Sequence, residues 1–449
     1  MAAETAPLVV LCWETDPGYV PPFRLSPNQI TVCVACPQMS QVSGFTGRPD
    51  ITVPPGVYDL EATLARVGLR DHPALIVVWS SALGANMPTN LGAFHCPKLL
   101  ICGDTHHMDK PIRRMLDYAL AERFDAVASV YDRHHLHWFL AAGFDKCAWL
   151  PGISVEHVAT AWQSDRADEV VFVGQTGPLH VYRNTLLQRV KQAGVPVRAG
   201  AARRAVSREL YARGAISFNC SLNGDLNMRV FEVLSAGGFL LTDRISASAG
   251  LAALLRIGED YETYRDGDEL LDKIAFYRAH PDAALRIAEH GAAHFRYCCL
   301  PELRRAELVN WMLDDTLPDV FNPRHDLRAE FSCASVDQLA LRVASYEALQ
   351  HRQQFQPDAT VLIPHDWPVA AALDLTDLVR MRLFAIEPWP ELRRAAAAAG
   401  VLSQLSFISL DAAARRDWDV VLTARQDDSA EPWRARAALV AFAAFRGAE

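Results

Sequence analysis

Several features typical of other protein classes are missing from these 449 residues. The sequence has no basic excess, because its formal net charge is −9, and this argues against a nucleic-acid-binding protein. No apolar run reaches the roughly 18 residues that a bilayer-spanning helix needs. Residues 1–11 carry no basic region ahead of a long apolar core, so we expect no signal peptide. These absences predict a cytoplasmic protein without stable insertion into a membrane.

Two cofactor motifs are also absent or incomplete. Cys33 and Cys36 form a C-x-x-C pair, but no second pair follows that could complete a zinc site. We therefore expect the ten scattered cysteines to be reduced core thiols. The G-x-G-x-x-G dinucleotide fingerprint does not follow the first predicted strand, which argues against an NAD-binding domain. The sequence thus predicts neither a bound metal nor a cofactor.

What the sequence does contain is a repeated alternation of short apolar segments and amphipathic segments. Its length suggests two or three domains. In residues 1–160, predicted buried strands are Leu8–Trp13, Ile30–Ala35, Ala74–Trp79, Leu99–Gly103, Ala126–Val130 and Cys147–Leu150. Predicted helices between them are Asp59–Val67, Pro111–Arg123 and His134–Ala142. This order is typical of an α/β fold with a doubly wound parallel sheet.

The alternation restarts after a polar linker at Pro151–Asp168 and predicts a second Rossmann-like domain over residues 168–320. Its predicted strands are Val170–Val173, Val195–Ala199, Ala215–Cys220 and Phe239–Thr242. Its predicted helices are Val181–Ala193, Val206–Arg213, Met228–Ala236, Asp268–Ala279, Ala283–His294 and Pro301–Asp314. Residues 335–449 predict a smaller α/β extension, with helices Ser335–Gln353 and Pro390–Ala399 and strands Thr360–Ile363, Arg382–Ile386, Leu405–Ser409 and Asp419–Leu422.

The segment Phe218–Asp243 is the most informative part of the sequence. It reads as a strand, a polar loop, a short helix, a Gly–Gly stop and another strand. Asn227 is a good N-cap for the helix, whose free N–H groups and positive dipole end suit a phosphate. Arg229 and Glu232 share one face, where they could hold phosphate oxygens and ribose hydroxyls. The alternative is an ordinary Arg–Glu pair on the surface of an amphipathic helix.

This segment resembles the group 1 glycosyltransferase signature, in the branch that includes the spore-maturation-protein-like enzymes. The similar residues run from Asn227 through Arg229, Phe231 and Glu232 to the Gly–Gly stop and the strand ending in Asp243. Upstream, the Val171–Gly174 strand end resembles the entry to the family's C-terminal domain, and the likeness covers roughly residues 168–314. It implies the GT-B fold, in which two Rossmann-like domains face a cleft, with the chain acting as a glycosyltransferase.

The resemblance also implies roles for individual residues at a nucleotide-sugar site. Glu232 would bind the ribose, and Arg229 the diphosphate or the sugar. The donor-site residues that it suggests are Gly174, Gln175, Thr176, Gly177, Arg183, Ser221, Asn223, Asp225, Asn227, Arg229 and Glu232. Many retaining relatives carry a second glutamate eight residues before the ribose-binding one, but here that position is Gly224, with Asp225 next to it. The catalytic base is therefore expected elsewhere.

We expect the base in the first domain, because ligands of parallel sheets bind beyond the carboxyl ends of the strands. The segment Gly103–His107 directly follows a predicted strand, and Asp104, His106 or His107 could deprotonate an acceptor hydroxyl. The alternative is a helix N-cap at Asp104 or Thr105 with solvated histidines.

Two other polar clusters follow predicted strands of the first domain. Tyr131–Trp138 contains three histidines and suggests a metal site, although adjacent histidines diverge on a helix, so a polar edge of the cleft or an N-cap at Asp132 is the favoured alternative. Trp13–Gly18 offers Glu14 or Asp16 as a reserve base.

The C-terminal extension faintly resembles the first four strands of an S-adenosylmethionine-dependent methyltransferase. Glu387 ends the second predicted strand, where such enzymes hold the ribose, but Pro364–Pro368 replaces the Gly-rich loop. The chain also ends before a full sheet is expected. A degenerate domain or a docking piece is favoured over a working methyltransferase.

The sequence thus predicts transfer of a sugar from a nucleotide-diphosphate donor to a hydroxyl of a carbohydrate, protein or small-molecule acceptor, without a metal. A homo-oligomer is possible. Two alternatives remain, a sugar-nucleotide epimerase and a non-catalytic nucleotide-binding or scaffold protein on the same architecture.

Overall fold

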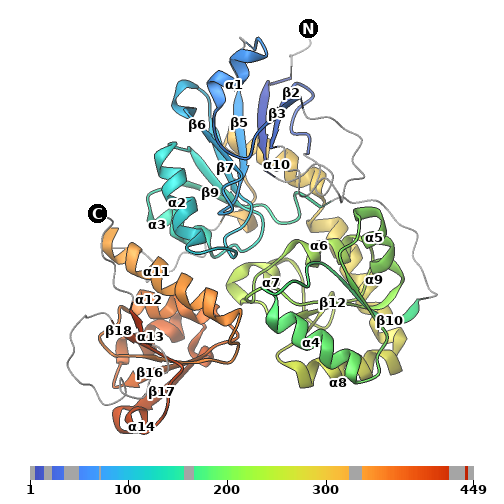
Figure 1. Cartoon of the computed structure of the whole chain (residues 1–449), viewed down its shortest axis with the longest axis vertical. Helices are drawn as coiled ribbons and strands as arrows, with labels where there is room; N and C mark the ends of the chain where they lie inside the picture. Colours follow the sequence, from blue (N-terminus) through green and yellow to red (C-terminus); the bar gives the residue numbers. More distant parts are fainter. Residues whose placement is uncertain are drawn as a thin grey trace.

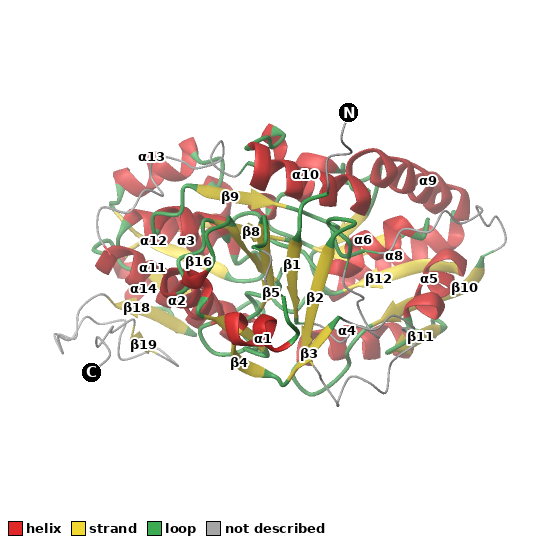
Figure 2. Ribbon diagram, turned by 90° about the horizontal axis from the view of Figure 1, so that it is seen from above, coloured by secondary structure: helices red, strands yellow, loops and turns green. Residues whose placement is uncertain are grey.

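The computed structural model describes residues 6–14, 23–34, 50–69, 72–155, 166–322, 336–423 and 440–442. The described residues form three large parallel sheets with helices around them, and a fourth sheet of only two strands. In Figure 1 the first domain lies at the top, the second at the lower right and the C-terminal domain at the lower left. Figure 2 shows the same elements from above, with helices flanking the strands. Asp16 and Cys36, which the sequence analysis singled out, lie outside the described residues.

The first domain is built on a seven-stranded sheet with the order β3-β2-β1-β5-β7-β8-β9, and every pairing in it is parallel. The strands are β1 (Val9–Trp13), β2 (Gln29–Val34), β3 (Ile51–Val53), β5 (Leu75–Ser80), β7 (Lys98–Cys102), β8 (Ala126–Ser129) and β9 (Lys146–Trp149). The helices are α1 (Leu60–Arg66), α2 (Pro111–Ala121) and α3 (Leu136–Ala141), and β4 (Gly56–Asp59) pairs with β6 (Asn86–Thr89).

Both faces of the first sheet are covered, which explains why its strands are almost wholly apolar. In β1, Val10 and Cys12 join the core cluster on one face, and the alternate residue Leu11 joins the cluster on the other. Leu308 and Trp311 of α10 (Pro301–Asp314) belong to this second cluster. The chain therefore returns to the first domain with α10, a helix that the sequence analysis assigned to the second domain.

The second domain is a five-stranded parallel sheet with the order β11-β10-β12-β13-β14. Its strands are β10 (Ala167–Val173), β11 (Val197–Gly200), β12 (Gly214–Asn219), β13 (Leu240–Asp243) and β14 (Glu262–Tyr264). Its helices are α4 (Val181–Gln192), α5 (Arg204–Arg213), α6 (Met228–Ser235), α7 (Leu251–Leu254), α8 (Gly267–Ala279) and α9 (Pro281–Cys298). The expectation of two Rossmann-like parallel-sheet domains is confirmed.

The C-terminal domain forms a five-stranded parallel sheet, one strand more than the four expected from the sequence. The order is β17-β16-β15-β18-β19, with β15 (Thr360–Ile363), β16 (Arg382–Glu387), β17 (Leu405–Ser409), β18 (Val420–Thr423) and β19 (Val440–Phe442). Its helices are α11 (Val336–Gln353), α12 (Val369–Asp374), α13 (Pro390–Ala398) and α14 (Leu410–Ala414). The sequence analysis left β19 unassigned, although it lies within the apolar run Ala437–Phe445.

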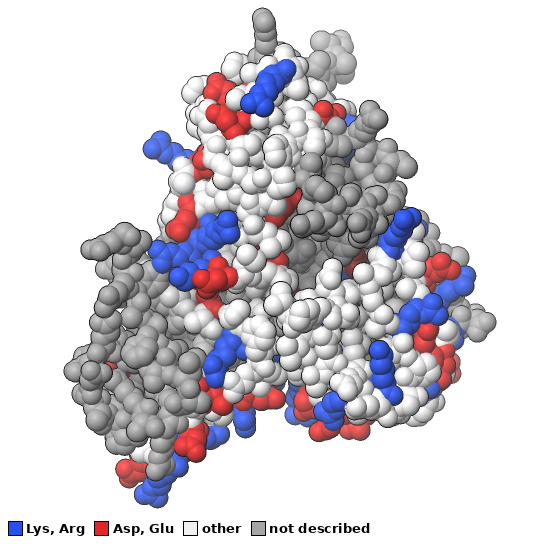
Figure 3. Space-filling view, viewed as in Figure 1, with Lys and Arg blue, Asp and Glu red and all other residues white. Residues whose placement is uncertain are grey.

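The surface agrees with the charge balance of the sequence. On the face drawn in Figure 3, the coloured basic side chains are interspersed with acidic ones and do not form one continuous basic patch. None of the helices in the described part of the chain combines the length and the apolar character needed to cross a bilayer.

Candidate active site

One cleft of about 560 Å³ lies between the first and second domains. Segments that follow β7, β10 and β12 line it, as expected where parallel strands of two sheets end. Of the residues expected from the sequence, the cleft brings together Asp104, His106, His107, Gly174, Gln175, Arg183, Asp225, Asn227, Arg229 and Glu232. Thr176, Gly177, Ser221 and Asn223 do not line it.

Asn227 stands at the N-cap position of α6, but it does not cap the helix. Its backbone is extended, and its side chain makes no capping hydrogen bond. Instead, Asn227 Nδ2 donates to Asn219 Oδ1 over 3.3 Å. Within the described part of the chain, no side chain caps the first-turn N–H groups of α6, which lie next to the cleft that Met228 and Arg229 line. Free N–H groups at a helix N-terminus form a site that can bind an anion.

Arg229 is held in place by the strand ends beneath it. Its Nε donates to the carbonyl oxygen of Val173 over 2.5 Å, and its Nη1 donates to Asn219 Oδ1 over 2.6 Å. The guanidinium lies over the ring of Phe172, 4.4 Å from the ring centroid. Because Arg229 and Glu232 form no ion pair with each other in the described structure, they are not the surface pair considered as an alternative.

Gly174 leaves the space that Arg229 occupies. Its φ is +154°, and a Cβ built at this position would collide with Arg229 Nη2. We expect Gly174→Ala to lower stability by about 1–3 kcal/mol, because it adds backbone strain, and to displace the guanidinium. Gly177→Ala is the matched control, since a Cβ there meets nothing within 4 Å. Denaturant unfolding measures the stability of both variants, and nucleotide titration measures their affinity. Equal stability and equal affinity of Gly174→Ala and Gly177→Ala would contradict this expectation.

Glu232 lines the same cleft one turn further along α6. Burial raises the pKa of its carboxyl, while the positive charges of Arg229 and Arg204 act in the opposite direction. The side chain accepts no hydrogen bond from the residues that the structure describes, so its oxygens are available to a ligand.

The loop that follows β10 is braced by α4. Arg183 is buried, and it donates to the carbonyl oxygens of Gln175 over 2.7 Å and of Cys220 over 2.9 Å. Asn184 Nδ2 lies 3.2 Å from the carbonyl oxygens of Thr176 and Gly177. The loop is thus positioned by side chains that follow it in the sequence, with only its first residues facing the cleft.

The opposite wall of the cleft carries a carboxylate–imidazole pair. Asp104 Oδ1 accepts the backbone N–H of His106 over 2.7 Å and that of His107 over 3.2 Å, and Asp104 Oδ2 contacts His107 Nδ1. Burial acts against it, but the hydrogen bond to Asp104 raises the pKa of His107. The helix α2 begins only at Pro111, so Asp104 stabilises a turn and is not the helix N-cap considered as an alternative.

His106 is buried and has both ring nitrogens engaged. Nε2 contacts Asp132 Oδ2, and Nδ1 lies 2.9 Å from Gln350 Nε2 of the C-terminal domain. Burial lowers the pKa of His106, but the carboxylates of Asp132 and Asp225 outweigh it and raise the pKa to about 9. Asp132 Oδ1 also accepts the backbone N–H of Leu226 over 2.9 Å. The His106–Asp132 pair of the first domain is thereby linked to the loop before α6 in the second domain.

The ligand-type atoms of His106, Asp132 and His135 lie within 4.8 Å of one another and could hold a metal ion. Each group already has protein partners, however. The two ring nitrogens of His135 lie 2.6 Å from Thr105 Oγ1 and 3.2 Å from the hydroxyl of Tyr346. We interpret the cluster as a hydrogen-bond network that fixes the floor of the cleft.

The remaining polar clusters of the first domain contribute little to the cleft. Of the segment Tyr131–Trp138, only Tyr131 lines it. His134 Nε2 lies 3.1 Å from the Tyr346 hydroxyl in the C-terminal domain. The reserve base Glu14 is buried against Ser81 Oγ at 2.5 Å, and burial raises its pKa to about 7.

Three polar residues of the cleft lining were not expected from the sequence, namely His180, Arg204 and Ser207. Burial and the charges of Arg183, His107 and Arg229 lower the pKa of His180 to about 4, so it contributes no positive charge at neutral pH. Arg204 is the first residue of α5, which follows β11, and this place beyond a strand's carboxyl end is the signal that could have identified it.

The sequence of the second domain matches a known family. Residues 169–309 match the model of a family described as glycosyl transferase-like. No curated protein matches the sequence.

Several solved structures are similar to the chain at low sequence identity. Anabaena HepE in complex with UDP and glucose is 13% identical, over 69% of this chain and 100% of that one, with a TM-score of 0.49. Sucrose-phosphate synthase from Thermosynechococcus elongatus is 11% identical over 68% and 100%, with a TM-score of 0.46. TarM from S. aureus in complex with UDP is 10% identical over 53% and 55%, with a TM-score of 0.41. The chain spans about half the length of the TarM structures.

The family match lies on the domain that carries α6 and the loop after β10, which form the larger part of the cleft wall. The chain thus combines a second domain that is similar to glycosyl transferases with two parallel-sheet Rossmann-like domains that line one cleft.

Proposed function

We propose that the protein transfers a sugar from a nucleotide-diphosphate sugar to an acceptor hydroxyl, without an essential metal ion. The observation that carries this proposal is a cleft with Arg229 and Glu232 on one wall and Asp104 and His107 on the other. Its volume of about 560 Å³ suits a ligand of nucleotide-sugar size. The assignment to the spore-maturation-protein-like branch is part of the same proposal.

The donor would bind to the wall formed by the second domain. Arg229 and the uncapped N-terminus of α6 would neutralise the diphosphate, with Arg183 close by. Glu232 would accept hydrogen bonds from the ribose hydroxyls. Because preorganised cations and helix amides stabilise a leaving diphosphate, a metal ion is not needed for that role.

His107 is the group best placed to deprotonate the acceptor. Asp104 engages one ring nitrogen, Nδ1, which leaves Nε2 as the base. His106 is less suitable, because both of its ring nitrogens already face protein partners. Asp104 then acts as a positioning residue, since both of its oxygens are held by the turn and by His107. This narrows the three candidates of the sequence analysis to one.

Gly224 does not supply a group on the donor side. It has φ +86°, a conformation that favours glycine, and the adjacent Asp225 uses Oδ1 to accept the N–H groups of Leu222 and Asn223. The position of the family's second glutamate is therefore occupied by a loop-forming residue. We place the base across the cleft for this reason.

A turnover assay tests the proposal. Purified protein is incubated with UDP-, GDP- and dTDP-sugars and a panel of hydroxyl acceptors, with and without EDTA. We expect acceptor-dependent release of one nucleotide diphosphate, unchanged by EDTA. Conversion of the donor sugar without any acceptor would favour an epimerase instead. Nucleotide binding without turnover under any acceptor would favour a scaffold role.

A further inference from the structure

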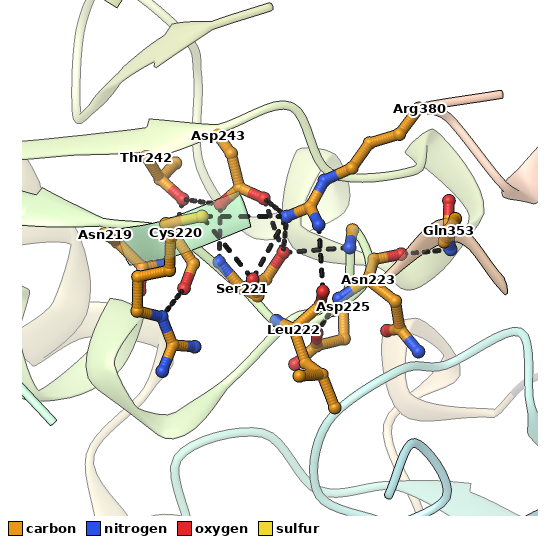
Figure 4. Close-up of polar contacts among 12 residues, drawn as sticks. Asn219, Cys220, Ser221, Leu222, Asn223, Asp225, Thr242, Asp243, Gln353 and Arg380 are labelled. Atoms are coloured by element: carbon orange, nitrogen blue, oxygen red, sulfur yellow. Dashed lines mark hydrogen bonds and ion pairs between the residues drawn. The ribbon is translucent and has the colours of Figure 1, made fainter. Parts of the chain in front are cut away.

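The loop Ser221–Asn227, which leads into α6, is held by the C-terminal domain. Arg380 lies between α12 and β16 and reaches into the second domain, where it is buried. Its Nη1 donates to the carbonyl oxygen of Leu222 over 2.9 Å, and its Nη2 donates to the carbonyl oxygen and Oγ of Ser221 over 3.1 and 2.9 Å. Figure 4 shows the guanidinium of Arg380 between this loop and Asp243.

Arg380 also forms a buried ion pair with Asp243 at the end of β13. Asp243 in turn accepts the backbone N–H of Ser221 over 2.9 Å and its Oγ–H over 2.5 Å. The same Oγ accepts the N–H of Gly224 over 2.9 Å. A single cation thus links Asp243 to two carbonyl groups and one hydroxyl of this turn of irregular backbone.

A second contact comes from α11 of the C-terminal domain. Gln353 is buried and donates its side-chain N–H to the carbonyl oxygen of Asn223. Arg380 and Gln353 therefore donate hydrogen bonds to three consecutive carbonyl groups of the loop, from Ser221 to Asn223. The other side of the loop lines the cleft with Leu222 and Asp225.

The same helix α11 contacts the opposite wall. Glu347 Oε1 accepts the first-turn N–H groups of α2 from Ile112 over 2.6 Å and Arg113 over 2.9 Å, so it supplies the cap that α2 lacks. Gln350 Nε2 lies 2.9 Å from His106 Nδ1, and Gln354 Nε2 donates to the carbonyl oxygen of His106 over 3.2 Å. One domain thus braces both walls of the cleft.

We propose that the C-terminal domain is part of the donor site, with Arg380 as a positioning residue that fixes the loop Ser221–Asn227, and with it the start of α6, for the diphosphate. This inference rests on the proposed function. Arg380 is not among the residues that line the cleft, and it acts through the loop. The C-terminal domain therefore positions the donor site for sugar transfer and does not catalyse a reaction of its own.

The test uses Arg380→Met in the full chain, with Arg382→Met as the matched control. Arg382 lies on β16 of the same domain, is exposed, and donates to the carbonyl oxygen of Asp358. We expect hydrogen exchange of the amides in residues 221–227 to rise about tenfold or more in Arg380→Met, because the loop loses its donor. Nucleotide-diphosphate affinity, titrated with UDP, GDP and dTDP, should fall about tenfold or more, and Arg382→Met should match wild type in both measurements.

A double variant separates positioning from general destabilisation. Arg380→Met leaves Asp243 as a buried charge without its cation, which lowers stability, whereas Arg380→Met with Asp243→Asn removes both charges. We expect the double variant to recover most of the melting temperature but not the nucleotide affinity, because the carbonyl groups of Ser221 and Leu222 still lack their donor. Recovery of both would mean that the single variant acted through stability alone.

The two proposals fail in different ways. Exchange of residues 221–227 that stays at the wild-type rate in Arg380→Met would overturn the positioning role, whether or not a ligand binds. Wild-type nucleotide affinity in Arg380→Met would also overturn it. If wild-type protein binds none of the three nucleotides, the proposed function and the link to the donor are both wrong, and the exchange data still decide whether the C-terminal domain orders the loop.

Discussion

Replacing His107 by alanine is expected to lower kcat by about 10² to 10⁴, with a much smaller change in donor affinity. His107 is the imidazole of the cleft whose Nδ1 is engaged by Asp104, and we assign its Nε2 to the acceptor proton. Loss of a positioned base affects the transition state more than donor binding. Steady-state kinetics with saturating donor and acceptor measure this, and a His107→Ala enzyme with wild-type kcat would remove His107 from the reaction.

The pH dependence distinguishes this role from a structural one. A base acts in its neutral form, and the hydrogen bond to Asp104 raises the pKa of His107 despite burial. The rate should therefore fall as the pH drops through that raised pKa. In Asp104→Asn the pKa of His107 falls, so the acidic limb of the profile should move to lower pH while the plateau rate decreases. A variant that loses only stability would not move that limb.

Replacing Arg229 by methionine is expected to weaken nucleotide-diphosphate binding by about 10- to 150-fold. A hydrogen bond to a charged group contributes about 1.5–3 kcal/mol, and one such bond to the diphosphate would be lost. Arg229 also secures Val173 and Asn219, so the variant should unfold at a lower temperature. Binding is measured by calorimetry well below that temperature.

Arg213→Met is the matched control for the arginine substitution. Arg213 ends α5 in the same domain, is exposed, and pairs with Glu209 on the surface. It should bind nucleotide as wild type does. Equal affinities for Arg229→Met and Arg213→Met would show that Arg229 does not contact the phosphates.

Much of the fold could be predicted, because buried parallel strands leave a plain signal. β1, β5 and β7 are runs of mostly apolar residues covered on both faces, and their predicted ranges differ from the observed ones by at most one residue at each end. Short elements such as β3 and β14 were missed, since three residues carry too little pattern. The return of α10 to the first sheet depends on tertiary packing that local periodicity does not encode.

The cleft was predicted less completely than the fold. Asp104, Arg229 and Glu232 follow strand ends or share a helix face, and local reasoning placed them together. Asn227 kept its predicted position but turns its side chain to Asn219, because the neighbouring strand end offers an acceptor that no local rule anticipates. The contact between Arg380 and Ser221 joins residues about 160 positions apart, and local sequence patterns do not predict contacts at that separation.

The central claim is that the cleft binds a nucleotide diphosphate through α6, and calorimetric titration tests it most directly. Wild-type protein and Glu232→Ala are titrated with UDP, GDP and dTDP. We predict that wild type binds at least one of them and that Glu232→Ala binds it about tenfold more weakly or worse, because the ribose loses its carboxylate. Absence of binding to all three, or equal affinity in the two proteins, would contradict the account.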